Sequence, residues 1–155
     1  MALYTINNSN AGTQQNMSSS YKTLIALTAA TATLRRFKIY DLLVGTDGTP
    51  ADNAMDWDIS RQTAAGIATA STPLALDPAD AASGTVGAVN ATAEGTITAS
   101  SSVFFVGVNQ RASYRWVAAP GSELVAPATN LAGFALRAKS PGYTSTATGT
   151  LYYQE

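Results

Sequence analysis

The stretch at residues 103–130 constrains the fold more than any other part of the sequence. It begins V-F-F-V-G-V, a run of β-branched and aromatic residues that predicts a strand buried on both faces or a strand in the interior of a sandwich. After the polar break at residues 109–111, apolar and polar side chains alternate, which places Tyr114 and Trp116 together on one buried face. The Pro-Gly pair at 120–121 then predicts a turn, because proline presets φ and glycine accepts a positive φ. This stretch therefore predicts consecutive strands joined by short turns.

Two segments nearer the N-terminus also predict strands. Residues 22–28 contain leucine and alanine, which favour a helix, but the threonine-rich continuation is poor helix material, so a strand is favoured. In residues 34–43 the alternation places Phe37 and Ile39 on one face, which we expect to be buried. Arg36 and Lys38 would then face solvent, as is common on strands near a sheet edge.

The segment after the turn cluster at residues 45–50 predicts the clearest amphipathic strand. Its apolar side chains would point into the core, and its polar side chains would point out into solvent. The inward set is Met55, Trp57 and Ile59, and the outward set is Asp56, Asp58 and Ser60.

The remaining strand-like segments complete an all-β pattern. They are weaker at residues 62–78 and 90–99 and clearer at 133–138 and 143–153, with a turn expected at 140–142. The chain holds about eight to ten short strands separated by turn signals roughly every dozen residues, which is typical of a sandwich or closed barrel. We predict an all-β, jelly-roll-like antiparallel β-sandwich that forms a single domain.

The N-terminal segment differs from the rest of the chain. Residues 3–7 alternate like a short strand, but residues 8–20 are polar and contain few apolar side chains. We predict that residues 1–20 form an extended arm, or a first short strand plus a loop, and that residues 21–155 form the β-sandwich domain. The sequence shows neither a signal-peptide pattern nor an apolar run long enough to span a bilayer, so we expect synthesis in the cytoplasm and no membrane partner.

Composition argues against an enzyme. The chain has no histidine and no cysteine, which removes the commonest general base and the commonest transition-metal ligands. Charged residues make up 12% of the chain, against roughly 25% in ordinary soluble domains, and the net charge is −1. The electrostatic footprint of a nucleic-acid-binding protein is missing. We therefore expect a non-enzymatic protein with a nearly neutral surface suited to close packing against other proteins.

Two groups of side chains are candidate sites. Asp56 and Asp58 share a strand face, with Asp47 and Asp52 in the preceding loop, and paired carboxylates can serve a glycosidase or a calcium site. The spacing of a calcium loop is not met, so a solvated strand face is the favoured interpretation. Aromatic residues can bind sugars, but most here lie at inward positions and are expected in the core or in an interface. These aromatic residues are Tyr40, Trp57, Tyr114, Trp116, Tyr143, Tyr152 and Tyr153.

Neither group carries a motif for catalysis or for a cofactor. The sequence Gly-Ser-Glu at 121–123 lacks the pattern of a nucleophile elbow, and no glycine-rich phosphate loop precedes a helix. We therefore predict no catalytic, cofactor-binding or metal-binding residues.

Three segments carry a family resemblance. They are R-R-F-K-I-Y-D at residues 35–41, G-T-P-A-D-N at 48–53, and the stretch at 109–124 that ends P-G-S-E-L. In these segments and in overall character, the chain resembles small structural proteins of tailed bacteriophages, most closely the jelly-roll decoration, or cement, proteins. The resemblance implies a homotrimer on the outer surface of the virion that clamps neighbouring major capsid subunits after the shell expands. It also implies that no residue is catalytic.

Under this hypothesis the polar segment at residues 3–20 and the loop surfaces are expected to attach the protein to the capsid. Such an arm would become ordered on the capsid and would offset some contact energy with lost chain entropy. Its removal would then leave a folded β-domain that binds capsids less well.

Two other classes of function share these features. A tail or fibre head domain that binds a host-surface glycan or receptor would have the same fold class, and a carbohydrate-binding module would have the same aromatic residues. Soluble glycan binding without affinity for capsids would favour either class over a decoration protein.

Overall fold

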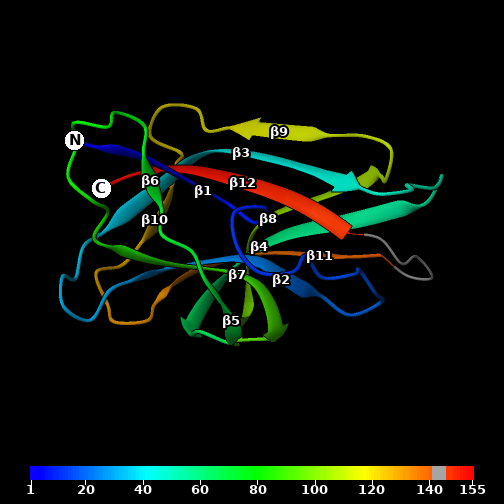
Figure 1. The fold of residues 1–155 in the computed structure, drawn as a ribbon, viewed down its shortest axis with the longest axis horizontal. Coiled ribbons are helices and arrows are strands. Elements are labelled where there is room, and N and C mark those ends of the chain that lie inside the picture. The colour runs from blue at the N-terminus through cyan, green and yellow to red at the C-terminus, as the bar shows by residue number, and fades with distance from the viewer. Residues whose placement is uncertain (141–145) are drawn as a thin grey trace.

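The computed structural model describes residues 1–140 and 146–155, and all the regular secondary structure in these residues is β-strand (Figure 1). The twelve strands found there are β1 (Leu3–Asn7), β2 (Lys22–Ala29), β3 (Phe37–Asp47), β4 (Ala54–Ala64), β5 (Ile67–Ala70), β6 (Leu74–Ala75), β7 (Thr85–Ala93), β8 (Thr96–Asn109), β9 (Tyr114–Val117), β10 (Leu124–Ala126), β11 (Gly133–Lys139) and β12 (Thr146–Gln154). The strands predicted at residues 22–28 and 34–43 are confirmed as β2 and β3. Pro141, Gly142 and Tyr143, which belong to the turn and strand predicted near residue 142, lie outside the described residues.

The strands form two six-stranded sheets that pack against each other. Sheet A has the order β10-β3-β12-β1-β6, and β9 lies along the same edge of β3 as β10. Sheet B has the order β5-β7-β2-β11-β4-β8. Strands β1 to β4 alternate between the two sheets, and the pairs of named strands are antiparallel. The predicted jelly-roll-like antiparallel β-sandwich is confirmed.

The core lies between the sheets and is filled by aromatic and aliphatic side chains from both. Phe37 of β3 meets Phe134 of β11 edge to face, with ring centroids 6.2 Å apart, and Phe37 also contacts Tyr153 of β12. Trp57 of β4 is only 1% exposed, and the inward alternation predicted for its strand is confirmed. These contacts join the sheets through strands that are far apart in sequence.

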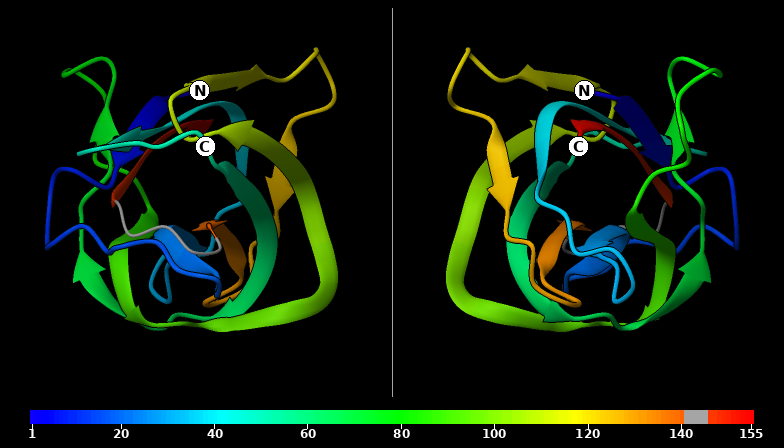
Figure 2. Two further views of the ribbon diagram at one scale, coloured as in Figure 1. Left: turned by 90° about the vertical axis from the view of Figure 1, so that its right-hand side faces the viewer. Right: turned by 90° about the vertical axis from the view of Figure 1, so that its left-hand side faces the viewer.

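Sheet B is bent round on itself (Figure 2). Strand β4 leads into β5 and β7 leads into β8, so these four strands form one continuous two-stranded ribbon. At the bend, Gly66 and Gly95 lie so close to the opposite backbone that neither position has room for a side chain. Strand β11 pairs with one end of the ribbon through β4, and β2 pairs with the other end through β7. The ribbon therefore encloses β2 and β11, and β2 is buried along nearly its whole length.

Strand β8 lies at the edge of sheet B and not in the sheet core. Phe104 packs partly against the core, whereas the next residue, Phe105, is 60% exposed. Of the two alternatives predicted for residues 103–108, burial on both faces is wrong, whereas the sandwich interior holds for one face, where Phe104, Val106 and Val108 pack against the core. Among the described strands β8 pairs only with β4, and only one of its faces is turned toward the core.

The N-terminal segment is built into the sandwich. Strand β1 lies between β12 and β6 in sheet A, and both Ile6 and Met17 are buried. The buried amide of Asn8 donates hydrogen bonds to Oδ1 of Asn90 at 3.1 Å and to the carbonyl of Ala147 at 2.9 Å. Of the two alternatives given for residues 1–20, the structure has the first short strand plus a loop, and the loop is tied to the sandwich through Asn8 and Met17.

Trp116 is less buried than the alternation predicts. It lies half-buried on β9, with its ring centroid 5.8 Å from that of Phe104 on β8. Tyr114 is also half-buried, and its ring centroid lies 6.1 Å from that of Phe104. The predicted full burial of this face is wrong, because β9 lies at the edge of sheet A and these rings bridge the edges of the two sheets.

Candidate functional site

The outward carboxylates of β4 belong to an ion-pair cluster with β11. The side chain of Asp58 is 3% exposed, and its Oδ2 accepts hydrogen bonds from Nε and Nη2 of Arg137 at 2.9 and 2.6 Å. Ser60 Oγ also donates to this oxygen, at 2.7 Å. The prediction of a solvated face is therefore wrong for Asp58 and Ser60. Strand pairing places Arg137, 79 residues away in sequence, directly opposite Asp58.

Tyr21 covers this cluster. Its ring lies 4.4 Å from the guanidinium of Arg137 and 4.8 Å from the ammonium of Lys139, which also pairs with Asp56 at 3.6 Å. Burial raises the pKa of Tyr21, and the nearby carboxylates of Asp58 and Asp56 raise it further. The cluster contains two carboxylates and two cations, so its formal charge is zero.

A hollow of about 340 Å³ lies beside the cluster, next to a bulge in β8. Residues 97–102 of β8 oppose only residues 60–62 of β4, so the extra residues of β8 leave the regular ladder. Ser101 holds this bulge in place: its hydroxyl accepts a hydrogen bond from the N–H of Arg61 at 3.1 Å and donates one to the carbonyl of Thr98 at 2.7 Å. The bulge forms one wall of the hollow, and β4 and β11 form the other.

The lining of the hollow combines hydroxyl groups with one exposed aromatic ring. The hydroxyls belong mainly to serines of β8, and Phe105 lies directly opposite Asp58 on the same face of the sheet. Ser100, in the bulge, has a φ of +54°, a left-handed conformation that is uncommon for residues other than glycine. Strained backbone of this kind is concentrated at binding sites. This hollow is the best candidate for a ligand site in the part of the chain that the structure describes.

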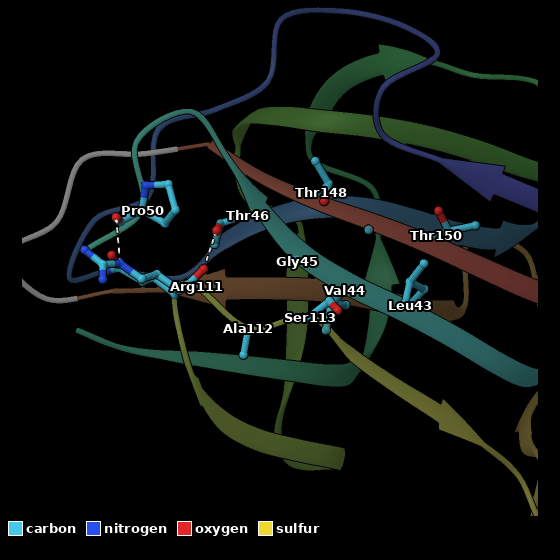
Figure 3. A pocket seen from close by; sticks show the side chains of 12 residues that line it. Leu43, Val44, Gly45, Thr46, Pro50, Arg111, Ala112, Ser113, Thr148 and Thr150 are labelled. Carbon is cyan, nitrogen blue, oxygen red and sulfur yellow. Dashed lines mark hydrogen bonds between the residues drawn. The ribbon is translucent and has the colours of Figure 1, made fainter. Parts of the chain in front are cut away.

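A second hollow, of about 320 Å³, lies between β3, β12 and the turn after β8 (Figure 3). Hydrogen bonds hold its walls together: the hydroxyl of Thr46 donates to the carbonyl of Gln110, and Nε of Arg111 donates to the carbonyl of Pro50 at 3.4 Å. Arg111 also pairs with Asp52 at 3.2 Å. Because Arg111, the charged residue at this hollow, already holds the loops together, we assign this hollow a structural role.

The four carboxylates named in the sequence do not form one group. Asp56 and Asp58 belong to the cluster on sheet B, whereas Asp52 pairs with Arg111 and Asp47 ends β3. Within residues 1–140 and 146–155, no group of three or more acidic side chains is arranged to hold a metal ion. In the same residues, no helix is long and apolar enough to cross a membrane.

The aromatic candidates are also divided. Tyr153 is buried, and its hydroxyl shares hydrogen bonds with Ser83 at 2.7 Å and Thr85 at 2.6 Å. Burial raises the pKa of Tyr153 far above its ordinary value. Tyr40 and Tyr152 are partly exposed on the outside of sheet A, with ring centroids 6.5 Å apart. The expectation of a core position is confirmed for Trp57 and Tyr153, whereas the other described members of the set are partly exposed, and an interface position for them stays a prediction.

Sequence reasoning did not identify three residues at the hollow. Tyr21 and Arg137 come from segments distant from β4, so only the paired strands bring them to Asp58. Phe105 belongs to the run expected in the core. One sequence signal for Arg137 exists. In the F-A-L-R-A-K run of β11, Arg137 and Lys139 are two residues apart and so share one strand face, and cations in a strand are commonly paired with acidic residues on a neighbouring strand.

The outside of sheet A is an exposed surface with little net charge, which we call the sheet A face. One row crosses five strands, and each residue is directly opposite the next: Leu74, Thr5, Tyr152, Asp41 and Val117. Leu74 and Val117 are 55% and 57% exposed, and Leu43 in the adjacent row is also exposed. Arg115, opposite Leu43, donates hydrogen bonds to both carboxylate oxygens of Asp41, at 3.1 and 2.5 Å, and so pairs the charge of Asp41 on this face.

No protein-family model matches this sequence, and no curated protein sequence matches it.

Proposed function

We propose that this protein is a non-enzymatic virion structural protein that decorates the outer capsid and stabilises it by bridging neighbouring major capsid subunits. It acts as a homotrimer on the capsid surface, is made in the host cytoplasm, and binds neither nucleic acid nor membrane. The observation that carries this proposal is the sheet A face, an exposed surface across five paired strands with apolar side chains at both ends.

The chemistry of the sheet A face suits docking against another protein. Exposed apolar side chains gathered on one surface are typical of protein contacts, and tyrosine and arginine are enriched there. Tyr152 lies at the centre of the face, and Arg115 reaches Asp41 from the edge strand β9. The carboxylate of Asp41 is already paired with Arg115, so covering the face leaves that charge with its partner.

Bridging also suits a protein whose individual contacts are weak. A homotrimer presents three copies of the sheet A face, and simultaneous contacts raise the overall affinity without any new kind of contact. The low charged fraction, 12% of residues, limits long-range repulsion between neighbouring copies on the shell. The family resemblance of residues 35–41 and 109–124 points to the same role.

The proposal is tested with expanded capsids that lack the protein, taken from the phage that encodes it. Purified protein is mixed with these shells, and the bound fraction is measured by sedimentation over a range of concentrations. We expect saturable binding, and we expect light scattering to give a solution mass of three times the 16.0 kDa chain. Absence of binding to such shells would overturn the proposal.

A tail or fibre head domain that binds a host-surface glycan or receptor is the second candidate. The hollow beside Asp58 favours it, because that hollow is a formed site that a purely structural protein does not need. Binding of the purified protein to host cells, without binding to shells, would select this alternative.

A further inference from the structure

The Asp58–Arg137 pair has hydrogen-bonding capacity that the fold does not use. Its contacts among the described residues involve Oδ2 of Asp58 and the Nε and Nη2 of Arg137, including the Nη2 bond to Ser60 Oγ at 2.9 Å. Oδ1 of the carboxylate and Nη1 of the guanidinium make no hydrogen bond to this part of the chain, and both residues line the hollow. An acceptor and a donor with fixed positions therefore stand side by side at its wall.

Stability alone does not explain this pair. The side chains of Asp58 and Arg137 are 3% and 15% exposed, so both charges have lost most of their contact with water. Replacing a buried ion pair by apolar side chains of similar size is often neutral or stabilising. The position of the Asp58–Arg137 pair at the wall of a hollow is better explained by a role in binding a ligand.

The charges around the hollow favour a neutral ligand. Asp56 and Asp58 are balanced by Arg137 and Lys139, so the cluster attracts neither anions nor cations as a whole. The serine hydroxyls of β8 add groups that can both donate and accept hydrogen bonds without adding charge. A ligand with several uncharged hydroxyl groups can form hydrogen bonds with Asp58, Arg137 and the serine hydroxyls at the same time.

Phe105 adds an apolar requirement to the same ligand. Its ring is 60% exposed and lies opposite Asp58, so an aromatic surface stands next to the paired donor and acceptor. A pyranose ring matches this combination, because its C–H face packs on an aromatic ring while its hydroxyl groups reach the polar wall. The volume of about 340 Å³ is at the small end of the range for ligand pockets, which suits a sugar ring better than a large cofactor.

We propose that this hollow binds a neutral hexopyranose unit of a glycan. Asp58 accepts hydrogen bonds from the sugar, Arg137 donates to an adjacent hydroxyl, and Phe105 packs against the ring. This binding activity goes beyond the capsid role. The hollow lies on the outside of sheet B, so it stays accessible when the opposite surface, the sheet A face, is docked.

The test measures binding of simple neutral glycosides to the purified full-length protein. The probes are the methyl α- and β-pyranosides of glucose, galactose, mannose and N-acetylglucosamine, followed by saturation-transfer NMR and titration. Phe105→Ala removes the exposed ring, and Val117→Ala is the matched control, because Val117 is exposed to a similar degree on the other sheet. We expect at least one glycoside to bind, Phe105→Ala to weaken it by about tenfold or more, and Val117→Ala to leave the affinity unchanged.

A second variant tests the polar wall. Asp58→Asn keeps the size of the side chain but removes the charge that accepts the sugar hydroxyls, and its melting curve shows whether the fold is retained. In a folded Asp58→Asn protein we expect glycoside binding to be lost. Only variants whose melting curves show a folded protein are compared. If Asp58→Asn is unfolded, the test relies on Phe105→Ala, because that position is exposed.

Three results would overturn this inference. They are absence of binding by every glycoside up to about 50 mM, equal affinity in the wild-type protein and Phe105→Ala, and displacement of the bound glycoside by inorganic phosphate at similar concentration. None of them affects shell binding, which depends on the sheet A face, so failure here and failure of the capsid role are distinguished by separate measurements.

Discussion

Trp57 and Trp116 lie at two different depths of the same sandwich. Trp57 is enclosed by the core, whereas Trp116 is half-buried against Phe104 at the edge. We predict that Trp57→Ala lowers the free energy of unfolding by about 3–5 kcal/mol, because it leaves a large cavity. Trp116→Ala should lower it by about 1–2 kcal/mol, because part of that ring already contacts water.

Urea unfolding followed by circular dichroism measures both losses. Trp57→Phe is the control, since it keeps an aromatic ring in the core and should cost less than Trp57→Ala. Equal losses for the two alanine variants would contradict the different depths.

Tyr153 makes the stability depend on pH in the alkaline range. Burial raises its pKa in the folded protein above the value of about 10 that a tyrosine has in an unfolded chain. A phenol with a raised folded-state pKa stabilises the fold fully below about pH 10. Above that pH the contribution is lost, at about 1.4 kcal/mol per pH unit, until the folded-state pKa is reached.

The alkaline prediction is measured as the free energy of unfolding between about pH 8 and 11. Tyr153→Phe should show a shallower decline than the wild-type protein, whereas Tyr152→Phe, at a partly exposed neighbouring position, should decline almost as steeply as the wild-type protein. Parallel curves for all three proteins would show that Tyr153 is not the group responsible.

At this scale, local alternation predicted the core side chains of β4 correctly, but it failed on the edge strand β9, where Tyr114 and Trp116 are half-buried, and it did not predict what the outward side chains contact. The inward positions of Met55, Trp57 and Ile59 follow from the two-residue period of a strand. The burial of Asp58 does not, because its partner Arg137 comes from a strand that only the folded sheet places beside it. A charged residue at an outward position can therefore be either exposed to solvent or paired with another charge. The sequence of its own strand does not show which of the two occurs.

At the scale of elements, a strand's composition does not determine its place in a sheet. β8 has the apolar residues expected of a central strand, yet it lies at the edge of sheet B, and its bulge builds the hollow. β1 is only five residues long and precedes a polar segment, yet it has a neighbour on each side in sheet A. Strand order depends on pairing between distant segments, so turn signals and alternation predicted the strands but not their order or the bulge.

The internal position of β1 leads to a prediction about truncation. Removing residues 2–18 takes Tyr4, Ile6 and Met17 out of the core and leaves β12 without one neighbour. We expect the truncated chain to lose cooperative thermal unfolding, measured by circular dichroism. Leu3→Ser, at an exposed position of the same strand, should change stability by less than about 0.5 kcal/mol.

The opposite result would change the account of the N-terminus. If the truncated chain unfolds cooperatively within a few degrees of the intact protein, then β1 is dispensable, and an attachment arm again becomes the better description of residues 1–20.

At the scale of the whole molecule, the two sheets give the protein two different outer surfaces. The sheet A face is exposed, partly apolar and closed by the Asp41–Arg115 pair, which suits contact with a protein. The outside of sheet B carries the hydroxyl-lined hollow, which suits a small neutral ligand. Docking through one surface and presenting the other would let a single domain serve both roles.

The central claim is that the protein docks on the capsid through the sheet A face, and sedimentation with shells that lack it tests this most directly. Three proteins are compared: the wild type, Val117→Glu on the sheet A face, and Phe105→Ala at the hollow. A glutamate at 117 places a new carboxylate beside Asp41, which an apolar contact cannot cover without cost. The account predicts that the wild type and Phe105→Ala bind alike and that Val117→Glu, while still folded, binds at least about tenfold more weakly. Equal binding by folded Val117→Glu and the wild type, or no binding by the wild type, would contradict it.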